Sequence, residues 1–106
     1  LARVALLTLK GRNEDKVKFS AEHLKRELER SLGTTDTSAS GSFRDLIIAG
    51  PAPAPLLRAE TYYRHQIMLR TRQMSRLSAA LARLLETHSL PDDVSLTVDI
   101  DPVNLV

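Results

Sequence analysis

One short stretch of the sequence places an aromatic ring, guanidinium groups and an amide at alternate positions. In an extended strand, one face of this stretch would carry Tyr62, Arg64, Gln66, Met68 and Arg70. Arg72 and Arg76 follow at the next expected helix. Guanidinium groups bind phosphates, and aromatic rings and guanidinium planes stack on nucleobases. The pattern predicts a face that holds single-stranded nucleic acid, or equally one that docks onto another protein domain, since arginine and tyrosine are also enriched at protein interfaces.

Charge is unevenly distributed, although the formal net charge is only +2. Residues 56–83 contain six arginines, of which Arg58 is the first, and the single acid Glu60. Residues 84–106 contain five acids and no Lys or Arg. A local arginine cluster is what a phosphate-contacting surface needs. The two segments would equally well neutralise each other in the fold, and the sequence leaves both interpretations open.

Several kinds of active site are disfavoured by the composition. The chain contains no cysteine, which excludes disulfides, thiol catalysis and thiolate metal sites. It has no glycine-rich phosphate loop, and its three histidines lie on different expected elements without metal-ligand spacing. The aspartates near the end of the chain fall in a turn or at a strand end, where structural roles are favoured. We therefore expect no catalytic, cofactor or metal site in this segment.

Hydrophobic periodicity predicts six secondary-structure elements. Strands are expected at residues 3–10, 43–49, 62–70 and 94–100, and helices at 14–32 and 73–88. Asn13 would cap the first helix, which would bury a stripe formed by Val17, Ala21, Leu24, Leu28 and Leu32. The order βαββαβ predicts a ferredoxin-like, split β-α-β fold of the α+β class. It has a four-stranded antiparallel sheet with two helices on one face.

The connections between these elements predict the domain organisation. Residues 34–42 read as a flexible polar loop. Residues 50–57 form a proline-rich connection, in which three alternating prolines fix φ and remove amide donors. This excludes helix interiors and central strands, so we expect an extended spacer of polyproline type. The chain is expected to be one domain over 1–106, and its lack of an initiator Met suggests a fragment of a longer polypeptide.

Three short motifs form a fairly specific combination. They are Gly50-Pro51-Ala52-Pro53-Ala54-Pro55, the strand sequence Tyr63-Arg64-His65-Gln66, and Asp99-Ile100-Asp101-Pro102. Together they resemble the C-terminal domain of the primosomal protein N′ (PriA) family, which are bacterial replication-restart DNA helicases. The resemblance spans nearly the whole chain and is strongest over residues 50–102.

The resemblance implies a domain of a larger ATP-dependent 3′-5′ DNA helicase that acts in replication restart, primosome assembly and repair. ATP, magnesium and zinc would bind the parent protein outside this segment. The implied partners are forked or single-stranded DNA, single-stranded DNA-binding protein, other primosome proteins and the rest of the parent helicase. The implied location is the bacterial cytoplasm, at the nucleoid, without a membrane partner.

We expect the DNA or partner surface to contain Arg58, Tyr62, Arg64, Gln66, Arg70, Arg72 and Arg76. In this hypothesis the proline spacer sets a fixed distance between the sheet and the helicase core, and so presents the basic strand at the DNA junction. The alternative is an interaction or scaffold domain, whose basic strand docks on the helicase core or on single-stranded DNA-binding protein.

Overall fold

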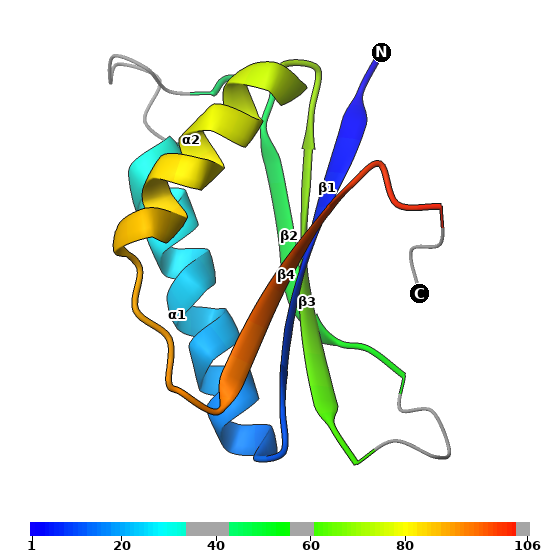
Figure 1. Cartoon of the computed structure of the whole chain (residues 1–106). Coiled ribbons are helices and arrows are strands. Elements are labelled where there is room, and N and C mark those ends of the chain that lie inside the picture. Colours follow the sequence, from blue (N-terminus) through cyan, green and yellow to red (C-terminus); the bar gives the residue numbers. More distant parts are fainter. Residues whose placement is uncertain (34–42, 56–60, 104–106) are drawn as a thin grey trace.

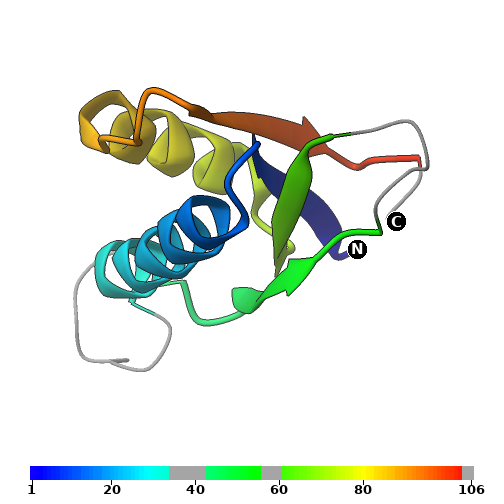
Figure 2. The ribbon, with the colours of Figure 1, turned by 90° about the horizontal axis from the view of Figure 1, so that it is seen from below.

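The computed structural model describes residues 1–33, 43–55 and 61–103. The element order is β1 (Arg3–Gly11), α1 (Glu14–Leu32), β2 (Ile47–Pro53), β3 (Tyr63–Thr71), α2 (Met74–Thr87) and β4 (Val94–Ile100). The strands form one antiparallel sheet in the order β2-β3-β1-β4, and both helices cover the same face (Figures 1 and 2). The predicted ferredoxin-like α+β fold is confirmed. The predicted loop at 34–42 lies outside the described residues.

Helix α1 packs as its sequence predicts. The side-chain oxygen of Asn13 accepts a hydrogen bond from the Lys16 amide at 3.0 Å and so satisfies a free donor of the first turn. Gly33 ends the helix with a φ of 59°, and its amide donates to the Glu29 carbonyl. The whole predicted stripe is buried: Val17, Ala21, Leu24, Leu28 and Leu32. It packs on the inner face of the sheet, where the fully buried apolar residues are Ala5, Leu7, Leu9, Ile67 and Leu69.

Strand β2 does not lie where the sequence predicted it. It was expected at 43–49, but it begins at Ile47 and continues to Pro53, so the predicted spacer is wrong over residues 50–53. The residues before Ile47 include a turn at positions 44–45, and the Phe43 amide donates to the carbonyl of Leu32 at the end of α1 at 3.2 Å. Phe43 and Leu46 are nevertheless buried, at 2% and 6% exposure, because they close the end of the core between α1 and the sheet. Residues 56–57 of the predicted connection lie outside the described part.

The alternating prolines fit this strand because β2 lies at the edge of the sheet. Successive amides in a strand point to opposite sides, so every second N–H faces the neighbouring strand. The Ala54 amide uses this position and donates to the Arg64 carbonyl at 3.0 Å. Pro51, Pro53 and Pro55 have the opposite parity, which directs their missing donors away from β3. The register of β2 against β3 shifts at a bulge between Ala49 and Ala52, after which the two strands pair again.

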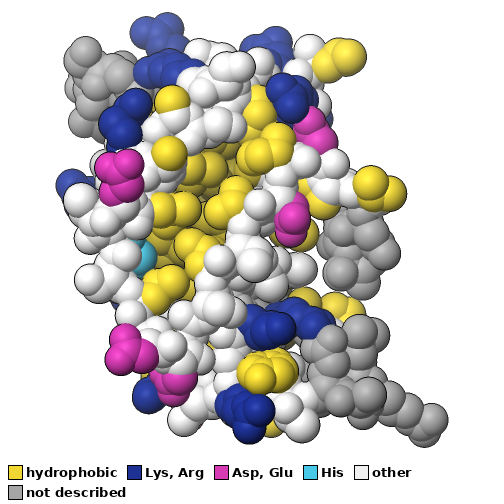
Figure 3. Space-filling view, viewed as in Figure 1, with side chains coloured by type: hydrophobic (Ala, Val, Ile, Leu, Met, Phe, Trp, Pro, Cys, Tyr) yellow, Lys and Arg dark blue, Asp and Glu magenta, His cyan; other side chains and the backbone are white. Residues whose placement is uncertain are grey.

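Helix α2 covers its side of the sheet less completely than α1 does. Its described length is one residue shorter at each end than the predicted 73–88, and only Met74, Leu77 and Leu81 are buried. The alternation of β4 predicted a buried face, but Val98 and Ile100 are each 39% exposed. Between the two elements lies an open apolar groove of about 270 Å³, seen as a band of hydrophobic side chains in Figure 3.

Gly50 gives a direct test of the bulged edge strand. Its φ is +95°, and a Cβ there would lie 2.7 Å from the Gln66 carbonyl oxygen on β3. We expect Gly50→Ala to lower the free energy of unfolding by about 1–3 kcal/mol, because backbone strain and a clash with main chain are both introduced. Urea denaturation measures the effect. Gly33→Asn is the control, since asparagine tolerates the φ of 59° there, and a wild-type midpoint for Gly50→Ala would contradict the assigned geometry.

Candidate nucleic-acid interface

The face of the sheet opposite the helices carries the predicted basic strand. Cross-strand pairing places Arg64 of β3 beside Lys10 of β1 at one end, and Arg70 beside Val4 at the other. Between them, Met68 lies beside Leu6 and Gln66 beside Thr8. We call this surface the outer face, defined by the outward residues of β3 and their neighbours on β1 and β2. It has basic ends and an apolar centre.

Tyr62 lies just before β3 and is surrounded by cations rather than offering an open ring. The ammonium of Lys10 lies 4.7 Å from the ring centroid, and the guanidinium of Arg12 lies 5.2 Å from it. Arg12 also donates a hydrogen bond to the Tyr62 hydroxyl at 3.3 Å, and this bond, with the charges of Arg12 and Lys10, lowers the pKa of Tyr62. The predicted stacking residue is therefore the centre of a basic cluster, which we call the Tyr62 cluster: Lys10, Arg12 and Tyr62.

Gln66 is oriented by the neighbouring strand. Its amide nitrogen donates to the Thr8 hydroxyl at 3.3 Å, across the pair that joins β3 to β1. The bond uses the amide nitrogen and leaves the side-chain carbonyl oxygen of Gln66 as an acceptor. Gln66 thus marks a polar position beside the apolar centre of the outer face.

At the other end of β3, Asp45 fixes the junction with α2. It accepts hydrogen bonds from the Arg72 amide at 2.7 Å, the Thr71 hydroxyl at 3.1 Å and the Gln73 side-chain amide at 3.3 Å. The Arg72 guanidinium adds an ion pair at 3.6 Å. The bond from the Arg72 backbone, followed by those from the side chains of Thr71, Gln73 and Arg72, lowers the pKa of Asp45.

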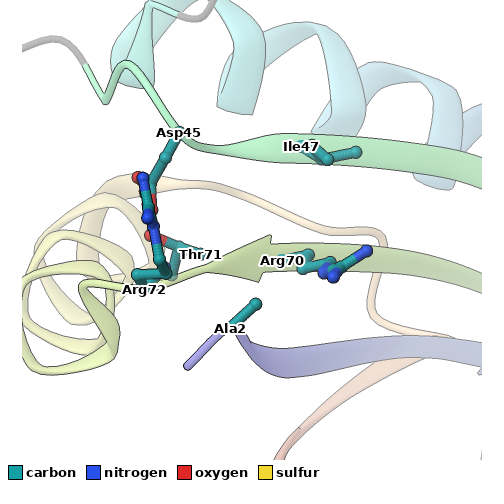
Figure 4. Close-up of a pocket in the computed structure, with 6 residues that line it drawn as sticks. All are labelled: Ala2, Asp45, Ile47, Arg70, Thr71 and Arg72. Atoms are coloured by element: carbon teal, nitrogen blue, oxygen red, sulfur yellow. Dashed lines mark hydrogen bonds and ion pairs between the residues drawn. The ribbon is translucent and has the colours of Figure 1, made fainter.

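A surface hollow of about 440 Å³ opens beside this junction (Figure 4). Its lining residues are Ala2, Asp45, Ile47, Arg70, Thr71 and Arg72. In Figure 4, Arg72 reaches back toward Asp45, whereas Arg70 extends along β3 away from that pair. Arg70 is exposed and makes no ion pair within the part of the chain that the structure describes. It is the arginine best placed to meet an anion at this end of the outer face.

The structure brings together some of the predicted contact residues and separates others. Tyr62, Arg64, Gln66 and Arg70 share the outer face, and Arg72 lies at its end. Arg76 lies apart from them, since its guanidinium packs 4.2 Å from the centre of the Phe43 ring and bonds Gln73. Arg58 lies outside the described residues. Lys10 and Arg12 also belong to this surface, although the local sequence pattern did not predict them.

Two features are absent from the described residues: a cluster of metal-binding side chains and a helix that could span a membrane. Among these residues, no three His, Cys, Asp or Glu side chains lie close enough together to hold a metal ion. Neither described helix is long and apolar enough to cross a bilayer.

Comparison with known proteins shows the family of this chain. The sequence profile of the family described as primosomal protein N C-terminal domain matches residues 1–103. The chain belongs to this family. It is also 26% identical over 102 residues to the replication restart protein PriA of Bacillus subtilis (strain 168), covering 93% of the chain. That alignment covers 11% of the relative, so the chain spans about a ninth of its length.

A solved structure supports the fold independently. The designed protein described as "De novo designed protein Foldit4" superposes with a TM-score of 0.61, covering 98% of this chain and all of that one. The identity is 12%, so this likeness concerns the fold alone.

The motifs that resemble the PriA family have structural roles in this chain. Gly50, Pro51 and Pro53 build the bulged edge strand, Pro55 follows it, and Tyr63 packs against the core. Asp101 joins the end of β4 to β1: it pairs with the Arg3 guanidinium at 2.7 Å and accepts from the Val4 amide at 3.3 Å. The bond from Arg3, followed by that from Val4, lowers the pKa of Asp101. Pro102 follows, and Asp99 lies opposite Leu6 at the border of the outer face.

Asp45→Asn tests the junction through its pH dependence. The native pKa of Asp45 is depressed, so its stabilisation is present above the ordinary value of about 3.9 and is lost as pH falls through the lower native value. We expect the variant to melt a few degrees below wild type at pH 7, with the gap closing as pH falls below about 4. Thermal melts followed by circular dichroism measure this gap. Asp99→Asn, an exposed carboxylate, should show no gap, and a gap for Asp45→Asn that stays constant with pH would contradict the role.

Proposed function

We propose that this domain binds single-stranded or forked DNA across its outer face, as the C-terminal domain of a replication-restart helicase. The observation that carries the proposal is the arrangement of this face, which has cations at both ends of β3 and apolar and amide side chains between them. Sheets that bind single strands combine basic groups for the phosphates with a centre that accepts bases.

Two basic groups would contact the phosphates. At one end, the Tyr62 cluster and Arg64 concentrate positive charge beside the end of β1. At the other end, Arg70 borders the hollow beside Asp45. Tyr62 in this proposal positions Lys10 and Arg12, instead of stacking on a base with an open ring. This is a different role from the one predicted from its residue type.

Membership of the family supports further proposals about the parent protein and its partners. The parent protein would be an ATP-dependent 3′-5′ DNA helicase, with ATP, magnesium and zinc bound outside this segment, and the segment itself would not be catalytic. Its partners would be forked or single-stranded DNA, single-stranded DNA-binding protein, other primosome proteins and the rest of the parent. The domain would act in replication and repair, in the bacterial cytoplasm at the nucleoid. Support comes from the family match and from the named relative.

Replacing Arg64 and Arg70 together with Ala tests DNA binding. Each phosphate contact with a single strand contributes about 0.7 to the slope of log K against log salt, so the double variant should bind more weakly and lose about 1.4 from the slope. Fluorescence anisotropy with single-stranded, duplex and forked DNA at two salt concentrations measures both. Replacing Lys18 and Arg26 together with Ala is the charge-matched control, since both are exposed cations of α1 in the other layer. An unchanged slope would reject the DNA role.

A second candidate function, docking onto the rest of the parent helicase, is favoured by the groove between α2 and β4. Its walls include Leu81, Leu85, Val98 and Ile100, and it lies in the helix layer, away from the outer face. Strand β4 is also an edge of the sheet and contains no proline or bulge, and no described strand pairs with its outer side, which favours pairing with an added strand. DNA binding and docking would thus use different surfaces.

Val98→Asp tests docking separately from DNA binding. A carboxylate in the groove would have to be desolvated on docking, so affinity for the parent helicase lacking this domain should fall at least about tenfold. Isothermal titration calorimetry measures this binding. Thr97→Asp places the same charge on the opposite face of β4 and should leave docking unchanged. Equal affinity for Val98→Asp and wild type would rule out the groove as the docking site.

A further inference from the structure

The apolar centre of the outer face contains a second open hollow, smaller than and separate from the one beside Asp45. It has a volume of about 170 Å³ and is lined by Leu6, Ala49, Gly50, Ala52, Gln66 and Met68. Its shape follows from the pairing, since Ala49 lies opposite Met68 and Ala52 lies opposite Gln66. Both β2 residues are small, and Gly50, which also lines the hollow in the bulge between them, has no side chain. Larger side chains at 49 and 52 would close the hollow.

The residues that line the hollow suit the binding of a flat, partly polar group. Leu6 and Met68 supply an apolar floor, and the thioether of Met68 suits contact with an aromatic ring. Gln66 stands at the border with its amide nitrogen bonded to Thr8 and its carbonyl oxygen available to accept from an N–H edge. A nucleobase combines these two features, an apolar face and a hydrogen-bonding edge.

The surroundings of the hollow contain one carboxylate, that of Asp99 opposite Leu6, but more cations, and this excess favours a polyanion as the molecule that carries the group. Lys10 and Arg64 lie toward one end of the outer face, and Arg70 lies toward the other. Arg64 and Arg70 are six residues apart on one strand, roughly 20 Å at the usual rise per residue. A single strand whose phosphates meet both ends must cross the centre. Lys10 and Arg12 already contact the Tyr62 ring, so the hollow is a better apolar binding site for a base than that ring is.

We propose that the hollow accepts one unstacked base of a single DNA strand that crosses the outer face. This inference rests on the proposed function and specifies how it is carried out. The base lies against Met68 and Leu6, its edge meets the Gln66 amide, and the flanking phosphates meet the basic ends. The small residues of β2 are then binding determinants, although they carry no charge or aromatic ring.

Filling the hollow tests the inference. Ala52 is exposed on the edge strand, so Ala52→Leu adds volume in the hollow without disturbing the core. Ala49→Leu fills the same space from the next row. Ala79→Leu makes the same substitution at an exposed position of α2 and is the matched control. Thermal melts establish that all three variants fold.

The probes are a short oligothymidylate and an abasic oligodeoxynucleotide of the same length, both labelled with fluorescein. Protein is titrated into each probe, and binding is measured by fluorescence anisotropy. Removing the seat of one base weakens binding by about tenfold. We expect Ala52→Leu and Ala49→Leu to bind oligothymidylate about tenfold more weakly and the abasic strand as wild type does. Ala79→Leu should bind both probes as wild type does.

The other outcomes separate this inference from the proposed function. Equal weakening on both probes, or no weakening on either, would overturn base insertion and leave DNA binding by the outer face standing. If wild type binds neither probe, the proposed binding of single strands fails and this inference fails with it, whereas binding of forked DNA is decided by the anisotropy titration of Arg64 and Arg70 variants. The hollow would then be a seat for a side chain of a docking protein.

Discussion

The antiparallel pairing of β1 with β3 is the constraint on which both faces of the molecule depend. It runs through nine residue pairs, from Arg3 with Thr71 to Gly11 with Tyr63, at the centre of the sheet. Because side chains alternate, a slip of one residue in one strand would move its buried leucines outward and its cations inward. Burial of the apolar set opposes any such slip. The arrangement of cations on the outer face is therefore fixed by the packing of the opposite face.

Much of the fold could be predicted because its signals are local. The stripe of α1 and the alternation of β3 each lie within one element, and both match the structure. The basic surface was predicted less completely, since Lys10 reaches Tyr62 only through the register of two strands far apart in sequence. Asp45 was overlooked for the same reason. Its hydrogen-bond partners lie more than 25 residues away, so no nearby residue in the sequence indicates that Asp45 fixes the junction of β3 with α2.

The two errors along the chain have different physical causes. Alternating prolines excluded a central strand correctly, but whether a strand is central depends on the sheet order, and β2 lies at the edge. The alternation of β4 identified which side faces the helices, but the degree of burial depends on how closely α2 approaches. Val98 and Ile100 remain partly exposed because α2 leaves the groove open beside them. Both properties are tertiary and no window of sequence contains them.

In the proline-alanine repeat of the edge strand, the two residue types alternate in the direction that their backbone nitrogens face. Its alanine amides face the sheet and its prolines face outward, so every second position has a different requirement. Loss or gain of one residue between Pro51 and Pro55 would exchange the two sets and turn a ring without a donor toward β3. A change of two residues would keep the order. Insertions and deletions in this segment among natural sequences should therefore be of even length.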